Sequence, residues 1–164
     1  MYKRQGLSVA VGMAIGLKSD NKNFRVFTLL GDGELSEGSI WEALLSANKY
    51  NLDNLVVIVD RNKLQITGRT EEVNPIEPLK DKFNSFGLST REIDGNSVHD
   101  LNDVLSFTPF EKNKVNVIIA NTIKGKGISF MENEVVWHHK VPTEEQYNLA
   151  LNELEKLKIN IEND

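Results

Sequence analysis

Two residues in this 164-residue chain carry oxygen donors that suit a divalent cation. Asp32 stands between two glycines directly after the apolar residues 26–30, and Asn62 follows the apolar residues 55–59. Each apolar run is typical of a buried parallel strand. Because the carboxyl ends of neighbouring parallel strands meet at one edge of a sheet, we expect Asp32 and Asn62 to lie together there. Carboxylate and amide oxygens are ligands of the kind that Mg²⁺ takes, usually shared with a phosphate group.

The glycines around Asp32 support the same interpretation. Gly31 and Gly33 would let the backbone approach a phosphate closely. Gly-Asp-Gly is also a common turn, and an isolated Asp32 would more often cap the following helix than bind a metal ion. The matching strand end at Asn62 favours coordination of a metal ion.

Other charged side chains offer weaker candidates. Glu34 and Glu37 precede a predicted helix, where interaction with the helix dipole is worth roughly 0.3–1 kcal/mol. His138 and His139 are adjacent, and on a strand they would point to opposite faces, so the pair does not predict a shared metal ion. From composition alone, these two histidines indicate a surface pair in a polar loop.

Strand-like and helix-like segments alternate along the chain. The pattern predicts an α/β fold with a mostly parallel sheet flanked by helices. Strands are expected at residues 25–30, 55–60, 89–93 (at the sheet edge) and 115–120, and helices at residues 6–18, 39–50, 79–86 and 98–107. Residues 6–18 are small or apolar around most of the helix, which predicts burial against the sheet or a partner chain. A final helix is expected from Thr143, with Gln146 completing a capping box.

Composition excludes several classes of function. The formal net charge is −5, so nucleic acid is not an expected partner. The chain has no cysteine, which excludes disulfides, thiolate catalysis and cysteine-based metal sites. No apolar stretch approaches membrane-spanning length, and no signal pattern is visible, so no membrane partner is expected and a cytoplasmic location is the default.

Three collinear blocks resemble one known family. Residues 31–68, GDGELSEGSIWEALLSANKYNLDNLVVIVDRNKLQITG, resemble the thiamine-diphosphate signature in the form found in transketolases. The resemblance continues in QGLSVAVGMAIGLK (5–18) and GKGISFMENEVVWHHKVP (125–142). It implies the thiamine-diphosphate-binding fold, with residues 1–164 forming a single, partial pyrophosphate-binding domain. It also implies that the pyrimidine-binding and C-terminal domains are absent, and that the domain is truncated at its N-terminus, where residues 1–4 replace a glycine-containing turn.

The resemblance assigns roles to individual residues. It implies thiamine diphosphate and Mg²⁺ as cofactors, with the metal ion held by the side chains of Asp32 and Asn62 and the main-chain carbonyl of Leu64. The implied cofactor contacts are Gly31, Gly33, Asn62, Ile66 and His138. His138 would also contact the bound sugar, although His139 follows it where the family more often has glycine. Glu37 matches a glutamate in a polar connection between paired active sites, so His138 and Glu37 are the implied catalytic residues.

The implied activity is transfer of a two-carbon ketol unit between sugar phosphates. The chain would supply the cofactor-binding part of a split transketolase and would be inactive without partner chains. Its partners would be a second copy of itself, a pyrimidine-binding transketolase subunit, or both. Two alternatives stay open from the sequence: a non-catalytic remnant that serves as an interaction module, and a component of another thiamine-diphosphate enzyme, either a deoxyxylulose-phosphate synthase or a 2-oxoacid dehydrogenase E1 subunit.

Overall fold

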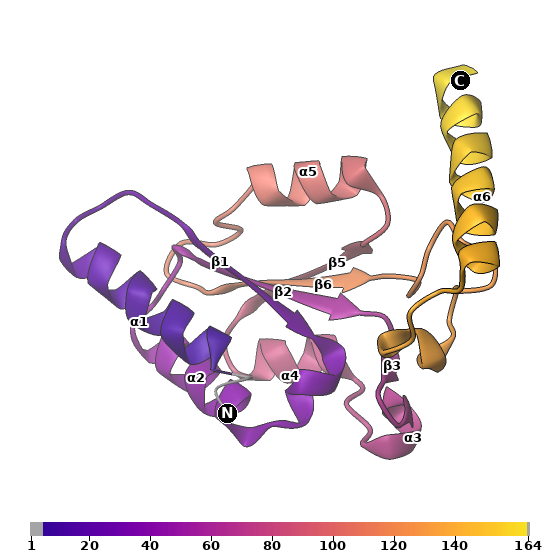
Figure 1. The fold of residues 1–164 in the computed structure, drawn as a ribbon. Coiled ribbons are helices and arrows are strands. Elements are labelled where there is room, and N and C mark those ends of the chain that lie inside the picture. The colour runs from indigo at the N-terminus through magenta and orange to yellow at the C-terminus, as the bar shows by residue number, and fades with distance from the viewer. Residues whose placement is uncertain (1–4, 164) are drawn as a thin grey trace.

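A four-stranded parallel sheet forms the centre of the protein (Figure 1). The structure is a computed structural model that describes residues 5–163. The strand order is β1-β2-β6-β5. These strands are β1 (Val26–Gly31), β2 (Leu55–Arg61), β5 (Ser89–Asp94) and β6 (Asn116–Asn121). The predicted fold class, the four strands and the edge position of β5 are confirmed.

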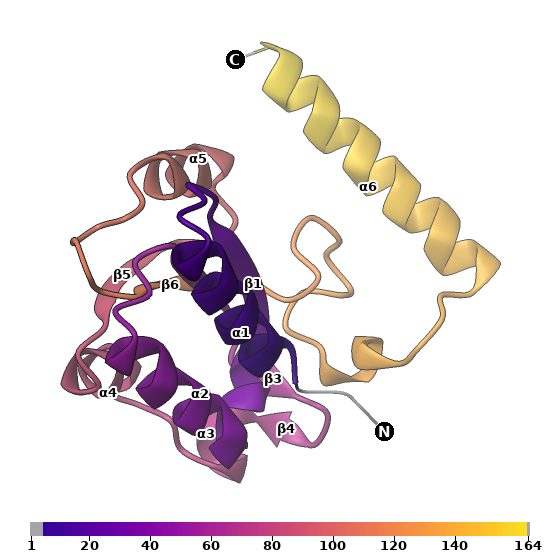
Figure 2. The ribbon, with the colours of Figure 1, turned by 90° about the vertical axis from the view of Figure 1, so that its left-hand side faces the viewer.

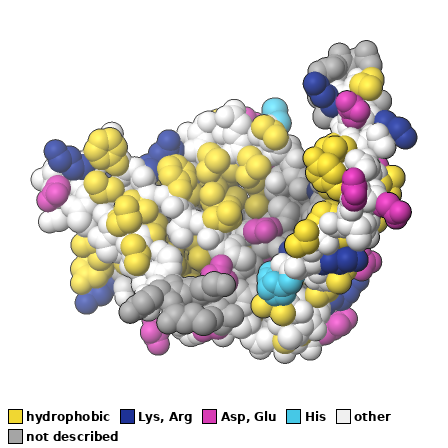
Figure 3. All heavy atoms as spheres, in the orientation of Figure 1, with side chains coloured by type: hydrophobic (Ala, Val, Ile, Leu, Met, Phe, Trp, Pro, Cys, Tyr) yellow, Lys and Arg dark blue, Asp and Glu magenta, His cyan; other side chains and the backbone are white. Residues whose placement is uncertain are grey.

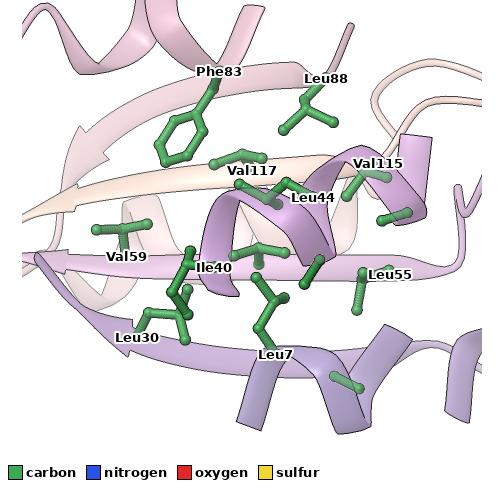
Figure 4. Close-up of a cluster of buried hydrophobic side chains, with 14 of the residues drawn as sticks. Leu7, Leu30, Ile40, Leu44, Leu55, Val59, Phe83, Leu88, Val115 and Val117 are labelled. Atoms are coloured by element: carbon green, nitrogen blue, oxygen red, sulfur yellow. The ribbon is translucent and has the colours of Figure 1, made fainter. Parts of the chain in front are cut away.

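Helices cover both faces of the sheet, but unequally. Three helices lie on one face, α1 (Gly6–Ser19), α2 (Gly38–Lys49) and α4 (Leu79–Ser85), and α5 (Val98–Ser106) lies on the other (Figure 1). The larger core lies on the three-helix side. There Leu7, Leu44 and Phe83 reach from three helices toward the strands, and each is fully buried (Figure 4). Full burial of such a side chain contributes about 1.5–3 kcal/mol.

Helix α1 packs against the sheet and α2 through one face, and its other face is exposed. Leu7 and Ala14 are completely buried, whereas Val9 and Met13 are 58% and 57% exposed. The sequence conceals this difference because small and apolar residues occupy both faces. The expected truncated turn at residues 1–4 lies outside the described residues.

Short elements fill segments where the sequence predicts only loops. A 3₁₀ turn, η1 (Asp32–Ser36), follows β1, and the hairpin β3 (Leu64–Gln65) and β4 (Gly68–Arg69) follows β2. A single helical turn, α3 (Thr70–Val73), comes next, and η2 (Val135–His138) interrupts the long polar segment before the last helix. Such short pieces have too few residues for a periodic pattern, so the sequence does not reveal them.

The last helix, α6 (Glu144–Asn163), extends away from the sheet (Figures 1 and 2). Its predicted capping box is confirmed: the Thr143 amide donates to Gln146 Oε1 at 3.1 Å, and the Gln146 amide donates to Thr143 Oγ1 at 3.3 Å. The Glu153 carboxylate accepts two hydrogen bonds of 2.7 Å from Ser129, which attaches the helix to the preceding loop. Within the described part of the chain, no helix has the length and apolar character to cross a membrane.

Candidate functional site

A pocket of about 660 Å³ opens at the carboxyl ends of β1 and β2. In the sheet register Gly31 pairs with Asp60, so the segments that follow the two strands leave the sheet side by side. All the residues to which the resemblance gives a role line this pocket: Gly31, Asp32, Gly33, Glu37, Asn62, Leu64, Ile66 and His138. The tertiary structure therefore brings Gly31 and His138, which are more than one hundred positions apart in the sequence, into one pocket.

Asp32 is held by a buried arginine that the sequence analysis did not single out. Arg61 Nη1 donates a hydrogen bond of 2.8 Å to Asp32 Oδ2, and the Lys63 amide donates one of 2.7 Å to the same oxygen. The side chains of Asp32 and Arg61 are only 1% and 2% exposed. A buried ion pair of this kind fixes the orientation of the carboxylate, because separating the charges would leave one of them uncompensated.

The same arginine binds the segment that follows β4. Its Nη1 donates to Thr70 Oγ1 at 2.6 Å, and its Nη2 donates to Glu71 Oε1 at 2.8 Å and to Glu77 Oε1 at 2.9 Å. Val73 and Asn74, which lie between these partners, line the pocket. Arg61 thus connects the candidate metal ligand Asp32 to one wall of the site.

For both Asp32 and Arg61, burial and the neighbouring charges shift the pKa in opposite directions. Burial raises the pKa of the Asp32 carboxyl, and the hydrogen bonds from Arg61 and Lys63 offset this only in part. Burial also opposes the charged form of Arg61, but the hydrogen bonds with Asp32 and Glu77 outweigh it and raise the pKa of Arg61. The charge on Asp32 therefore depends on having a cation beside it.

The Asn62 amide is oriented by its neighbours. Its Nδ2 donates to Asp60 Oδ2 at 3.1 Å, and its Oδ1 accepts from the Leu64 amide at 3.0 Å. Asp60 is itself bound by the Thr122 hydroxyl from the end of β6. These contacts hold Asn62 at the edge of the pocket, with Leu64 at the start of β3 beside it.

Gly33 lies where a side chain would be crowded. A Cβ atom built at this position would be 3.1 Å from the Cβ of Gln65. Glycine removes that crowding and leaves the backbone of η1 accessible from the pocket. On the other side of Asp32, the Gly31 amide donates to Glu34 Oε2 at 2.7 Å, which links the end of β1 to the 3₁₀ turn.

His138 and Lys124 reach the pocket from the long segment after β6. Burial, together with the charge of Lys124 and the neighbouring His139, lowers the pKa of His138, so its imidazole is neutral near pH 7. His139 packs edge-on against His138, with ring centroids 4.6 Å apart, but it does not line the pocket. The two histidines therefore lie in different environments.

The donor set suits a metal ion that is shared with a phosphate group. Among residues 5–163 no cluster of three or more His, Cys, Asp or Glu side chains is arranged to hold a metal ion. Asp32, Asn62 and the Leu64 carbonyl would instead supply one carboxylate, one amide and one main-chain oxygen. Mg²⁺ commonly binds in this way, with few protein ligands and with phosphate oxygens and water completing the octahedron. The residues present thus fit a Mg²⁺-diphosphate group.

Comparison with known proteins identifies the family. Residues 4–154 match the family model described as transketolase, thiamine diphosphate binding domain. The chain belongs to this transketolase family. The resemblance noted from the three sequence blocks is thereby confirmed.

Two curated relatives are named as transketolase subunits. The chain is 46% identical over 149 residues to a subunit of the apulose-4-phosphate transketolase from Phocaeicola vulgatus, a match that covers 91% of this chain and 53% of that protein. It is 43% identical over 152 residues to a 6-deoxy-6-sulfo-D-fructose transketolase subunit from a Clostridium species, a match that covers 93% of this chain and 55% of that protein. The chain therefore spans about half the length of these relatives.

Solved transketolases share the fold. The transketolase from Campylobacter jejuni superposes with a TM-score of 0.80 at 31% identity, covering 89% of this chain and 24% of that one. The transketolase from Leishmania mexicana superposes with a TM-score of 0.71 at 21% identity, covering 98% of this chain and 29% of that one. At this identity the match supports the fold alone.

Proposed function

We propose that this chain is the cofactor-binding part of a split transketolase, which transfers a two-carbon ketol unit between sugar phosphates. One observation carries the proposal: every residue to which the transketolase resemblance gives a role lines a single pocket at the carboxyl edge of the sheet. The family assignment and the relatives named transketolase subunits support it. They do not favour a deoxyxylulose-phosphate synthase or a 2-oxoacid dehydrogenase subunit.

Different residues of the pocket would bind different parts of the cofactor. Asp32, Asn62 and the Leu64 carbonyl would bind Mg²⁺, with Arg61 keeping the Asp32 carboxylate oriented. Gly33 would bring its backbone close to the diphosphate, and Lys124 would add positive charge. When bound, thiamine diphosphate supplies the carbanion-stabilising chemistry that ketol transfer needs.

His138 and Glu37 would act next to the cofactor. A neutral His138 can both donate and accept a hydrogen bond, so it can contact the diphosphate and a sugar hydroxyl. Glu37 lines the pocket just before α2, and we assign it to a polar connection with a second active site. Ile66 would contribute an apolar contact to the cofactor.

The proposed enzyme also requires partner chains. The relatives are named as transketolase subunits, so by their names they belong to multi-subunit enzymes. We propose a second copy of this chain, a pyrimidine-binding transketolase subunit, or both as partners, and sugar phosphates as substrates. Because sugar phosphates are cytoplasmic metabolites, we propose the cytoplasm as the location.

A second candidate function is a diphosphate-binding module without catalytic activity. The comparisons do not favour it, but binding of the cofactor alone would not distinguish it from the first candidate. The two candidates share cofactor binding and differ in activity with partners, so they can be tested in sequence.

The first experiment is calorimetric titration of the chain with thiamine diphosphate, in Mg²⁺ and then in excess EDTA. We expect saturable binding that EDTA abolishes and that Asp32→Asn or Asn62→Ala weakens at least tenfold. Asp81→Asn, at an exposed carboxylate on α4, is the matched control and should bind normally. Circular dichroism of each variant separates loss of binding from loss of folding.

Two outcomes decide between the alternatives. Binding of equal strength in EDTA and in the folded Asn62→Ala variant would contradict the proposed site. If the cofactor binds as expected, the chain is mixed with a pyrimidine-binding subunit of one of its relatives and assayed for ketol transfer. Activity supports the split transketolase, whereas cofactor binding without activity supports the non-catalytic module.

A further inference from the structure

Two consecutive residues at the end of β2 each contact one of the candidate metal ligands. Arg61 donates a hydrogen bond to Asp32. Its neighbour Asp60, whose side chain points to the opposite face of the sheet, accepts one from Asn62. Acidic side chains and histidine side chains near η2 come to the surface at this edge of the sheet (Figure 3). Asp60 needs a different explanation from Arg61, because it is an acid beside a candidate cation site.

The partners of the Asn62 amide determine which way it points. Its Nδ2 donates to Asp60 Oδ2 at 3.1 Å, and its Oδ1 accepts from the Leu64 amide at 3.0 Å. A carboxylate only accepts and a backbone amide only donates, so exchanging the two ends of the Asn62 side chain would break both hydrogen bonds. The oxygen of Asn62 therefore stays on the side of Leu64, whose carbonyl is the third candidate ligand.

Asp60 is itself held in place. The Thr122 hydroxyl donates to its other oxygen, Oδ1, from the end of β6. The Thr122 amide donates to the Arg61 carbonyl at 3.2 Å, which fixes Thr122 against β2. The turn after β5 passes close to Thr122 at Gly95, where an added Cβ atom would lie 2.5 Å from Thr122 Cγ2. Both oxygens of Asp60 are thus engaged by protein groups, as expected of a residue that orients a metal ligand.

From these contacts we infer that Asp60 is a positioning residue, which keeps the Asn62 oxygen turned toward the cation and makes an amide necessary at position 62. A carboxylate at position 62 would face the carboxylate of Asp60, and two such charges in a half-buried site repel each other. The inference rests on the proposed function, because it concerns a ligand of the proposed Mg²⁺ site. It adds that a residue outside the ligand set determines the chemical type of one ligand.

Cofactor binding separates positioning from direct coordination. Calorimetry measures the affinity for thiamine diphosphate over a range of Mg²⁺ concentrations. Asp60→Asn keeps an oxygen that can accept from Asn62 and should bind within about threefold of wild type, whereas Asp60→Leu removes the acceptor and should bind about tenfold more weakly. The Mg²⁺ concentration needed for half-maximal binding should rise in the same order. Asp94→Leu, at an exposed carboxylate at the end of β5, is the matched control and should bind as wild type.

Stability without metal tests why position 62 carries an amide. In urea unfolding with EDTA, Asn62→Asp should lower the midpoint, because two carboxylates then face each other. Adding Asp60→Asn should restore the midpoint, since one amide and one carboxylate are again opposed. Asp94 and Asn96 at the end of β5 have the same spacing in the sequence, but both are exposed. Asn96→Asp is therefore the matched control and should leave the midpoint nearly unchanged.

The outcomes distinguish this inference from the proposed function. If wild type does not bind the cofactor, or binds it equally well in EDTA, the proposed Mg²⁺ site fails and the role of Asp60 fails with it. If wild type needs Mg²⁺ but Asp60→Asn binds as weakly as Asp60→Leu, only the inference is overturned. Wild-type binding by Asp60→Leu, or a double variant no more stable than Asn62→Asp, would overturn it too. The stability measurement decides even if Asp60→Leu does not fold.

Discussion

The guanidinium of Arg61 lies 2.8 Å from the carboxylate of Asp32, and both side chains are almost completely excluded from solvent. This pair joins the end of β2 to the first residue after β1. Through Glu71 and Glu77 it also reaches the segment that contributes Val73 and Asn74 to the pocket. The orientation of the candidate metal ligand and the position of one pocket wall therefore depend on one arginine.

Replacing Arg61 by methionine is expected to destabilise the protein by about 3–5 kcal/mol, because it leaves Asp32 buried without its counter-charge. The free energy of unfolding in urea measures this effect. Arg69→Met, at an exposed arginine on β4, is the control and should change stability by less than about 0.5 kcal/mol. Recovery of stability in the double variant Arg61→Met with Asp32→Leu would identify the uncompensated charge as the cause. Equal losses of stability in Arg61→Met and Arg69→Met would refute this explanation.

A methyl group at position 33 is expected to weaken cofactor binding. The added Cβ would lie 3.1 Å from Gln65, so η1 or β3 must shift to accommodate it. Overpacking of this kind costs about 1–3 kcal/mol, and we expect roughly a tenfold loss of affinity for thiamine diphosphate in Gly33→Ala. Gly38→Ala is the control, since a Cβ there meets no atom within 4 Å. Calorimetry on both variants tests the prediction, which fails if their affinities are alike.

The stability of the protein is expected to fall in acid partly through Asp53. Burial alone would raise the pKa of Asp53, but hydrogen bonds of 2.9 Å from Lys18 and from the Asn113 amide outweigh it and lower the pKa. A carboxylate whose pKa is lower in the folded state stabilises the fold above its unfolded pKa, and this contribution is lost as the pH falls toward the folded value. Wild type should therefore lose more stability than Asp53→Asn between about pH 7 and pH 3.

Urea midpoints at several pH values make that comparison, with Asp81→Asn as a control that should follow wild type. If Asp53→Asn and wild type lose stability in parallel, the carboxylate does not contribute in this way.

Affinity for the cofactor is expected to depend on pH through His138. Because the pKa of His138 is lowered, the imidazole is neutral at pH 7 and becomes a cation only on the acid side of its ordinary range. Protonation would add a positive charge next to the diphosphate, so wild type should gain affinity relative to His138→Gln as the pH falls from about 7 to about 5.5. His99→Gln, at an exposed histidine on α5 outside the pocket, should behave as wild type. The comparison uses calorimetry, and a constant ratio between wild type and His138→Gln would exclude this role.

The sequence by itself determined the parallel pairing of β1 with β2 and the edge of the sheet at which chemistry was to be expected. Apolar runs that end at Gly31 and shortly before Asn62 predict parallel strands, and in a parallel sheet their carboxyl ends must share an edge. Local signals were also sufficient for the start of α6, because the capping box of Thr143 and Gln146 involves residues only three positions apart.

Only the tertiary structure decided the partners of Asp32 and the exposure of β1. Arg61 is an ordinary basic residue in the sequence, and its burial depends on Glu71 and Glu77, which lie in a segment without periodicity. Likewise, the apolar residues of β1 suggest a strand covered on both sides, yet Phe27 and Leu29 face solvent beside α5. Both features depend on which distant segments pack together, and a pattern within a short stretch of chain carries no information about that.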